Sequence, residues 1–247
     1  MTALLPAVGA IGGAIVGSFL ATVCIRWPEG RQAMAGRSSC DHCGRVLRVA
    51  ELVPVLSAVI SRGKCQSCGA RIAPLHLAVE VGSAALAGIA LLLQPNLNGV
   101  ALALFWLLLL APAVLDARHF WLPNALTAVL AVGGLLIGGL ATGATLPDRL
   151  IGGAAGFVSL AVLAIAYSRL RGREGLGAGD PKLLAAIGLW TGWAALPGIL
   201  AVASLAGLAI ALVQRRAASD RMPFGALLAG AAVLWSAVAA ARGAASF

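Results

Sequence analysis

The chain has 247 residues, of which 60% are hydrophobic and only 11% are charged, and its mean hydropathy is +0.95. A soluble domain carries about 25% charged residues, so this composition excludes a soluble protein and indicates an integral membrane protein. The formal net charge is +9, but the basic residues lie between apolar stretches, so we expect the lipid bilayer and no nucleic acid as a partner.

Apolar segments of span length recur along the whole chain, which excludes a soluble domain with a single anchor. The candidate spans are 4–24, 77–93, 99–115, 125–142, 150–168, 183–195, 196–213 and 224–241. The sixth is short and contains Gly192, so seven spans or a re-entrant segment remain alternatives. The first has no basic region before it and is long for a signal peptide, so we expect a retained span. The predicted fold class is an all-α polytopic membrane protein with about eight transmembrane helices.

The distribution of lysine and arginine predicts the orientation of these helices. With eight spans, 16 basic residues lie on one side, and only Arg149 and Arg242 lie on the other. The basic side, which includes Arg173, Arg216 and the loop 26–76, is therefore expected to face the cytoplasm, and both termini to face outward. Glycine and alanine are frequent within the spans, for example at 152–156, and we expect them to allow close packing of helices.

The loop 26–76 contains two pairs of cysteines separated by 21 residues. Four thiolates in such pairs can close a tetrahedral site around zinc. The loop is small and polar, and a reducing cytoplasm argues against disulfides. We predict a structural Zn²⁺ site formed by Cys40, Cys43, Cys65 and Cys68. His42 is interpreted as a surface residue, and Cys24 as a packing residue of the first span.

A glycine-rich stretch, 175–182, lies between two apolar runs and contains Asp180. Three glycines in five residues let the backbone bend tightly and let other groups approach closely. An acidic residue at the edge of a span is a hypothesis for a functional site, and the alternative is a turn in which Asp180 caps the next helix. Glu80, inside the second span, is expected to form a structural ion pair with Arg71 or Lys64.

Asp116 ends the third span on the same predicted side as Asp180. Two carboxylates that come together share one proton, so one can activate water while the other donates a proton to a carbonyl oxygen. This is the chemistry of amide hydrolysis without a covalent intermediate. The sequence does not show that the two meet, and helix capping remains an alternative for each. Two other functional classes remain as alternatives. They are a proton-coupled transporter and a non-enzymatic membrane scaffold with a zinc-ribbon docking loop.

Several motifs occur in one order along the chain. They are Gly17-Ser18-Phe19-Leu20, Arg26-x-Pro28, Ser39-x-x-x-Cys43, Leu52-x-Pro54-Val55-Leu56-Ser57, Arg62-Gly63-Lys64-Cys65-x-x-Cys68, Val79-Glu80, Leu115-Asp116 to Leu122-Pro123-Asn124, and Gly177-Ala178-Gly179-Asp180-x-Lys182-Leu183. In this order and spacing, the chain resembles the bacterial type IV prepilin peptidases, which belong to the G-x-G-D class of intramembrane aspartyl proteases.

The resemblance implies that Asp116 and Asp180 are the catalytic pair. The absence of side chains at Gly177 and Gly179 would let an extended substrate backbone come close to Asp180. Lys182 is expected to contact the substrate or a lipid phosphate, with a snorkelling anchor as the alternative. The expected reaction is cleavage of a short basic leader from prepilins or pseudopilins, immediately after a glycine, in a bacterial cytoplasmic (inner) membrane. Family members with the cysteine-bearing loop also N-methylate the new terminal residue with S-adenosylmethionine.

The resemblance further implies a first helix over 1–25, a cytoplasmic four-cysteine domain over 26–76 with a methyltransferase role, and a peptidase domain over 77–247. Glu51, Gly63 and Lys64 are the candidates for the methyl-transfer site. The chain departs from the family pattern at Ala58, His76 and Pro181. These departures bear on substrate geometry and on the efficiency of methyl transfer, and not on the peptidase assignment. Pro181 is compatible with a helix that begins there, because proline is well tolerated at the first position of a helix.

Overall fold

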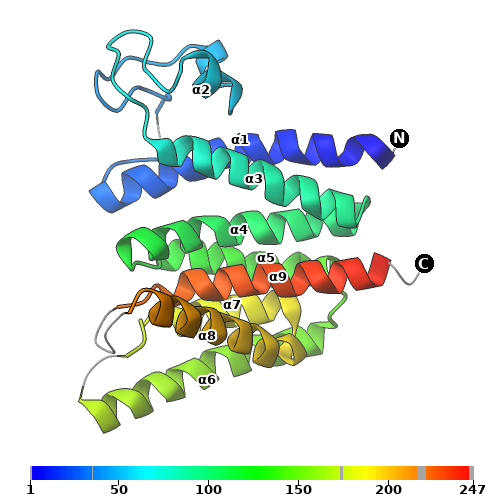
Figure 1. Cartoon of the computed structure of the whole chain (residues 1–247). Coiled ribbons are helices and arrows are strands. Elements are labelled where there is room, and N and C mark those ends of the chain that lie inside the picture. The colour runs from blue at the N-terminus through cyan, green and yellow to red at the C-terminus, as the bar shows by residue number, and fades with distance from the viewer. Residues whose placement is uncertain (1, 35, 173–174, 216–220, 245–247) are drawn as a thin grey trace.

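The computed structural model describes residues 2–34, 36–172, 175–215 and 221–244, and these are mostly helical, with no strand among them (Figure 1). The helices are α1 (Leu5–Arg26), α2 (Leu56–Ile60), α3 (Pro74–Leu93), α4 (Leu97–His119), α5 (Asn124–Thr142), α6 (Leu146–Arg171), α7 (Asp180–Thr191), α8 (Leu196–Val213) and α9 (Phe224–Ala244). Short 3-10 segments are η1 (Thr2–Leu4), η2 (Trp27–Glu29), η3 (Val49–Leu52) and η4 (Trp193–Ala195). The all-α prediction is confirmed. Arg173 and Arg216 lie outside the described residues.

Seven helices of the described chain are long and apolar enough to cross a membrane: α1, α3, α4, α5, α6, α8 and α9. The sixth predicted span is α7, which has only 12 residues. A helix of that length is roughly 18 Å long, against about 30 Å for the hydrocarbon core of a bilayer. Length and composition alone therefore single out seven spans. However, both chain ends lie at one end of the bundle (Figure 1), and Gly192 at the end of α7 lies beside Ala144 and Asp148, at the end opposite Asp180. The chain therefore passes between the two ends of the bundle eight times, with α7 as the short passage.

The short helix α7 lies inside the bundle. Leu183, Leu184, Ile187 and Trp190 have no exposed surface. Trp190 stacks on Phe105 of α4 with ring centroids 4.8 Å apart, and its indole N–H donates to the Leu130 carbonyl oxygen of α5 at 2.7 Å. Other helices therefore enclose α7 and shield it from lipid.

Glycines allow the helices to approach closely, as predicted from the sequence. At the crossing of α6 and α7, a methyl group added to Gly152 would lie 2.6 Å from the Gly188 carbonyl oxygen. A methyl group added to Gly188 would in turn overlap the Gly152 carbonyl. Gly156 likewise faces the backbone of Leu184. This backbone contact fixes the position of α7, and with it the helix end that carries Asp180.

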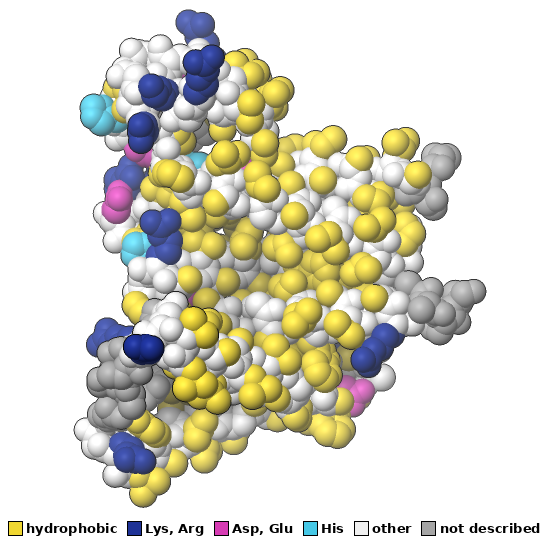
Figure 2. Space-filling view, viewed as in Figure 1, with side chains coloured by type: hydrophobic (Ala, Val, Ile, Leu, Met, Phe, Trp, Pro, Cys, Tyr) yellow, Lys and Arg dark blue, Asp and Glu magenta, His cyan; other side chains and the backbone are white. Residues whose placement is uncertain are grey.

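The segment between α1 and α3 (residues 27–73, the four-cysteine loop) projects from one end of the bundle, and both chain ends lie at the other end (Figure 1). Figure 2 shows lysine and arginine side chains concentrated at the end with the four-cysteine loop, and a hydrophobic belt between the two ends. This arrangement agrees with the predicted separation of charge. That the end with the four-cysteine loop faces the cytoplasm stays a prediction.

Candidate active site

Two buried carboxylates meet at the end of the bundle that carries the four-cysteine loop. Asp116 lies near the end of α4 and is 6% exposed, and Asp180 is the first residue of α7 and is 4% exposed. A methyl group added at Gly225 would lie 3.0 Å from Asp116 Oδ2 and 3.1 Å from Asp180 Oδ1. The two side chains therefore face the same point in front of α9. This arrangement, which the sequence could not show, makes paired acid–base chemistry sterically feasible.

Backbone N–H groups hold one oxygen of each carboxylate. Asp116 Oδ2 accepts a hydrogen bond from the Ala226 amide at 2.8 Å, and Asp180 Oδ2 accepts one from the Gly177 amide at 3.0 Å. The N-cap position of α7 is Gly179, so Asp180 does not cap its own helix. Asp116 lies near the C-terminal end of α4 and does not cap that helix, but Ala226 belongs to the first turn of α9, so Asp116 caps the start of a neighbouring helix. The capping alternative is therefore wrong for Asp180, whereas Asp116 has a capping contact in addition to facing Asp180.

The glycines before Asp180 have definite neighbours. A methyl group on Gly177 would lie 3.2 Å from Asp180 Oδ2, and one on Gly179 would lie 2.7 Å from Leu122 Cβ. Gly177 thus leaves room for the Asp180 carboxylate, and Gly179 lets the turn pack against Leu122. Lys182 Nζ donates to Asn124 Oδ1 at 2.8 Å, which joins the first turns of α7 and α5. Pro181 is buried in the first turn of α7, where its ring is tolerated.

The four cysteines of the loop form the second cluster. Their sulfur atoms all lie within 4.8 Å of one another, and the sulfurs of Cys40 and Cys68 are 4.0 Å apart. In a tetrahedral zinc site with Zn–S bonds of about 2.3 Å, the sulfurs lie about 3.8 Å apart. A small inward shift of the side chains completes that geometry, so the cluster could hold a metal ion.

The two cysteine pairs have the same backbone structure. In each, the first cysteine accepts a hydrogen bond from a glycine four residues later, Gly44 or Gly69, at 2.9 Å, and both glycines have φ of +70°. Amide N–H groups of Cys68 and Ser67 also lower the pKa of the Cys65 thiol to about 6. Since zinc binds the thiolate form, these amides favour metal binding. Cys24 is buried in α1, apart from the cluster, and His42 is exposed, as predicted.

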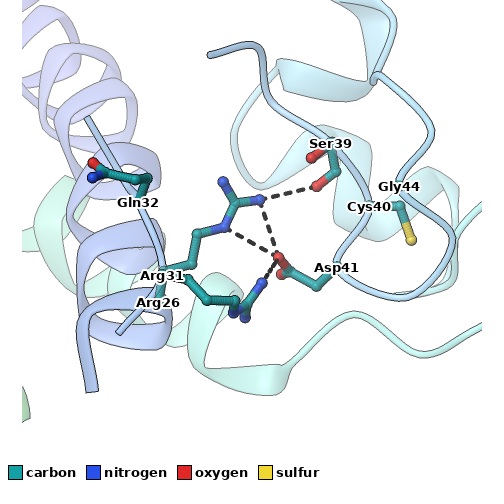
Figure 3. A pocket seen from close by; sticks show the side chains of 7 residues that line it. All are labelled: Arg26, Arg31, Gln32, Ser39, Cys40, Asp41 and Gly44. Carbon is teal, nitrogen blue, oxygen red and sulfur yellow. Dashed lines mark hydrogen bonds and ion pairs between the residues drawn. The ribbon is translucent and has the colours of Figure 1, made fainter. Parts of the chain in front are cut away.

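An ionic cluster joins the first cysteine pair to the end of α1 (Figure 3). Asp41 Oδ1 accepts hydrogen bonds from Arg26 Nε at 3.1 Å and from an Arg31 guanidinium nitrogen at 2.8 Å. Arg26 also donates to the Ser39 carbonyl oxygen at 3.2 Å. These two arginines hold the pKa of the Asp41 carboxyl below its ordinary value, although burial acts against them. The four-cysteine loop is therefore attached to α1 by charged hydrogen bonds.

Comparison with known families agrees with this geometry. Residues 11–93 match the bacterial peptidase A24 N-terminal domain, and residues 102–212 match the type IV leader peptidase family. The chain belongs to the type IV leader peptidase family.

Relatives of this leader peptidase include enzymes named prepilin leader peptidase/N-methyltransferase. One from Burkholderia pseudomallei is 42% identical over 207 residues, covering 81% of this chain and 67% of the relative, and one from Aeromonas hydrophila is 39% identical over 210 residues, covering 82% and 72%. A type 4 prepilin-like proteins leader peptide-processing enzyme of Escherichia coli is 34% identical over 247 residues, covering 92% and 91%. No solved structure matches the chain.

In this leader peptidase, the candidates for methyl transfer lie in the four-cysteine loop. Glu51 accepts hydrogen bonds from the Arg45 side chain at 2.6 Å and from the Arg48 amide at 2.8 Å. These donors lower the pKa of the Glu51 carboxyl. Gly63, with φ of +65°, and Lys64 form the turn that leads into the second cysteine pair. Glu51 thus has a structural role in η3, and Gly63 occupies a left-handed position suited to glycine.

The predicted ion pair of Glu80 is wrong. Glu80 is buried in α3, and its Oε2 accepts a hydrogen bond from the Val55 amide at 2.7 Å. Neither Arg71 nor Lys64 forms an ion pair with it in the described part of the chain. The carboxylate therefore fixes the four-cysteine loop to α3 through the backbone.

Sequence reasoning also missed the part of the peptidase that covers the two aspartates. Gly225, in the first turn of α9, lies against both carboxylates, and Ala226 supplies the N–H group that holds Asp116. The available signal was a glycine directly after Pro-Phe at the beginning of the last span. A backbone donor, however, has no side-chain signature in a single sequence.

Gly225→Ala is expected to reduce leader cleavage at least about tenfold, since shifts of about 1 Å at a reacting centre can cost that much or more. The added methyl group would lie within 3.1 Å of an oxygen of each aspartate and 2.8 Å from Leu122 Cδ1. Gly230→Ala is the matched control, because nothing lies within 4 Å of a methyl group at that position of α9. Cleavage rates of a prepilin by the two variants at equal amounts of folded protein check the prediction. Equal rates would contradict it.

Proposed function

We propose that the chain is a prepilin peptidase that removes the short basic leader from type IV prepilins or pseudopilins after a glycine, at the cytoplasmic face of a bacterial inner membrane. One observation supports this above all. In a chain of the type IV leader peptidase family, two buried aspartates from separate helices face one point in front of Gly225. Neither a scaffold nor a turn requires that arrangement.

The mechanism follows from the two carboxylates. Ionised, one of them takes a proton from water as the water attacks the scissile carbonyl carbon. The other, protonated, donates to the carbonyl oxygen, and the leaving amine then receives a proton as the C–N bond breaks. The Ala226 amide donates a hydrogen bond to Asp116 Oδ2, and the Gly177 amide donates one to Asp180 Oδ2. These amides orient the carboxylates toward the point in front of Gly225, where water and the scissile carbonyl would meet Asp116 Oδ2 and Asp180 Oδ1.

Substrate entry follows from the position of the pair. The apolar segment of the prepilin would lie in the bilayer, with its basic leader on the side of the four-cysteine loop. Gly177, Gly179 and Lys182 lie beside Asp180, where the backbone of the substrate would approach. A proton-coupled transporter places its ionisable groups near the midplane, whereas both aspartates here lie at helix ends on one side. Uptake by proteoliposomes without leader cleavage would favour the transporter.

Methyl transfer to the new N-terminus is a second proposed activity, supported by the names of the relatives. We assign it to the four-cysteine loop, with Glu51, Gly63 and Lys64 as candidate residues. S-adenosylmethionine would supply the methyl group. Zinc, held by the four cysteines, would maintain the fold of the loop.

Cys65→Ser together with Cys68→Ser is expected to remove the metal and abolish methylation, while cleavage continues. Two of the four ligands are lost, so the loop loses its metal cross-link, but the aspartates belong to other helices. Metal content by mass spectrometry, and product analysis with S-adenosylmethionine, check both parts. Cys24→Ala is the control, since this buried thiol lies apart from the cluster and should leave the metal in place. Full methylation by the double variant would refute the assignment to the loop.

A further inference from the structure

One flank of the four-cysteine loop is covered with exposed apolar side chains that no described residue covers. We call this the η3–α2 patch. Its members are between 42% and 81% exposed, and they are Val49, Leu52, Val53, Leu56, Val59 and Ile60. Contiguous apolar surface of this kind marks an interaction site.

The η3–α2 patch points along the direction of the spans. The four-cysteine loop lies beside the ends of α1 and α3, not across the end of the bundle, and α2 lies on the flank of the loop nearer the chain termini (Figure 1). Figure 2 shows hydrophobic side chains on this flank, while lysine and arginine side chains occupy the other flanks of the loop. With the spans in a bilayer, this flank faces the surface of the leaflet beside the bundle.

A strained backbone fixes the patch relative to α3. Val55 has φ of 63°, and the Leu56 amide donates to the Pro54 carbonyl oxygen at 2.6 Å, which forms a γ-turn. A β-branched residue in this conformation persists only when its surroundings hold it there. The buried Glu80 carboxylate does so, by accepting the Val55 amide. The start of α2 is thereby attached to a membrane-spanning helix.

The patch is also continuous with the lipid-facing surface of α1. Leu52 lines the same hollow as Ser18, Phe19 and Thr22, and Phe19 is an exposed aromatic side chain of that span. The loop 26–76 carries eight basic side chains and three acidic ones, so its charge complements the anionic headgroups of a membrane. Apolar surface bordered by basic residues is typical of segments that lie in the interface.

We propose that the η3–α2 patch is inserted at the boundary between headgroups and acyl chains of the leaflet that the four-cysteine loop adjoins. The loop is then a monotopic element, attached to the membrane by the patch as well as by α1 and α3. The inference depends on the membrane placement of the spans and not on peptidase or methyltransferase activity.

The test uses the full chain in nanodiscs of phosphatidylethanolamine and phosphatidylglycerol. Genetically encoded p-benzoylphenylalanine replaces Val59 in one variant and Ile60 in a second. A third, matched variant carries it at His42, which is exposed in the first cysteine pair. After irradiation, mass spectrometry counts covalent lipid adducts. Unchanged metal content in each variant shows that the loop remains folded.

Lipid adducts are expected at positions 59 and 60 in about tenfold excess over position 42, because only the patch lies at the depth of the acyl chains. Equal yields at the three positions, or no lipid adducts at all, would overturn the proposal. Adducts to a second copy of the chain, or only to added prepilin, would assign the patch to a protein partner and overturn it equally. Loss of leader cleavage in any variant has no bearing on this result, so the proposed function is tested separately.

Discussion

Asp180→Asn and Asp116→Asn are each expected to reduce leader cleavage at least about a thousandfold, because loss of an essential general acid or base costs on the order of 10²–10⁴ and the pair acts as a unit. Asparagine keeps the shape of the side chain and can still accept the N–H group of Gly177 or Ala226. It can neither take a proton from water nor share one with the remaining carboxylate. Cleavage of a synthetic prepilin by purified protein in nanodiscs measures the effect.

Asp148→Asn is the matched control for these variants. Asp148 lies in the first turn of α6, away from the two aspartates. It accepts hydrogen bonds from the Thr145 hydroxyl and the Trp193 indole N–H. It should retain cleavage near the level of the unmodified protein. All three variants should insert into membranes in similar amounts. Substantial leader removal by Asp180→Asn would contradict the assignment.

Gly188→Val is expected to lower the free energy of unfolding more than any other single substitution at a helix crossing of this protein. The Gly188 Cα faces the Gly152 carbonyl across the contact of α6 and α7, with no space for a methyl group. Overpacking of a close-packed core typically costs about 1–3 kcal/mol, and more where the backbone itself must move. Separation of these helices also displaces Asp180, so cleavage should fall together with stability.

Thermal unfolding in detergent, followed by tryptophan fluorescence, measures the stability of this variant. Gly12→Val in α1 is the control, because nothing lies within 4 Å of an added Cβ atom there. Its unfolding temperature should stay close to that of the unmodified protein. If Gly188→Val unfolded at the same temperature as Gly12→Val and cleaved as fast, the close crossing would have no role in positioning Asp180.

Most of the topology could be predicted from the sequence, because hydropathy over long segments and the distribution of basic residues depend little on tertiary contacts. The apolar run from Leu183 to Val213 is divided in the prediction where the structure divides it, because the predicted spans 183–195 and 196–213 correspond to α7 with η4 and to α8. Gly192, with φ of 78° at the end of α7, marks that break in the structure. Hydropathy could not show that α7 is enclosed by other helices. A buried helix of 12 residues is compatible with lipid only because neighbouring helices cover it.

The site was only partly predictable. Residue type and position singled out Asp116 and Asp180, but their meeting depends on how α4, α7 and α9 pack. Glu80 illustrates the same limit, because its charge suggested an ionic partner and its actual partner is a backbone amide. The cysteines were more predictable, since the same short motif builds both pairs and each pair determines its own backbone geometry.

The most direct test of the central claim is a single incubation of the protein in nanodiscs with a synthetic prepilin, labelled S-adenosylmethionine and ¹⁸O-enriched water. Mass spectrometry of the products reports the cleavage position, the source of the new carboxylate oxygen and the methyl group together. We predict a leader that ends at glycine and carries ¹⁸O from water, and a mature chain with a labelled N-methyl group, with both products absent for Asp180→Asn. An uncut prepilin with the unmodified protein, or a cut one with the variant, would contradict the account.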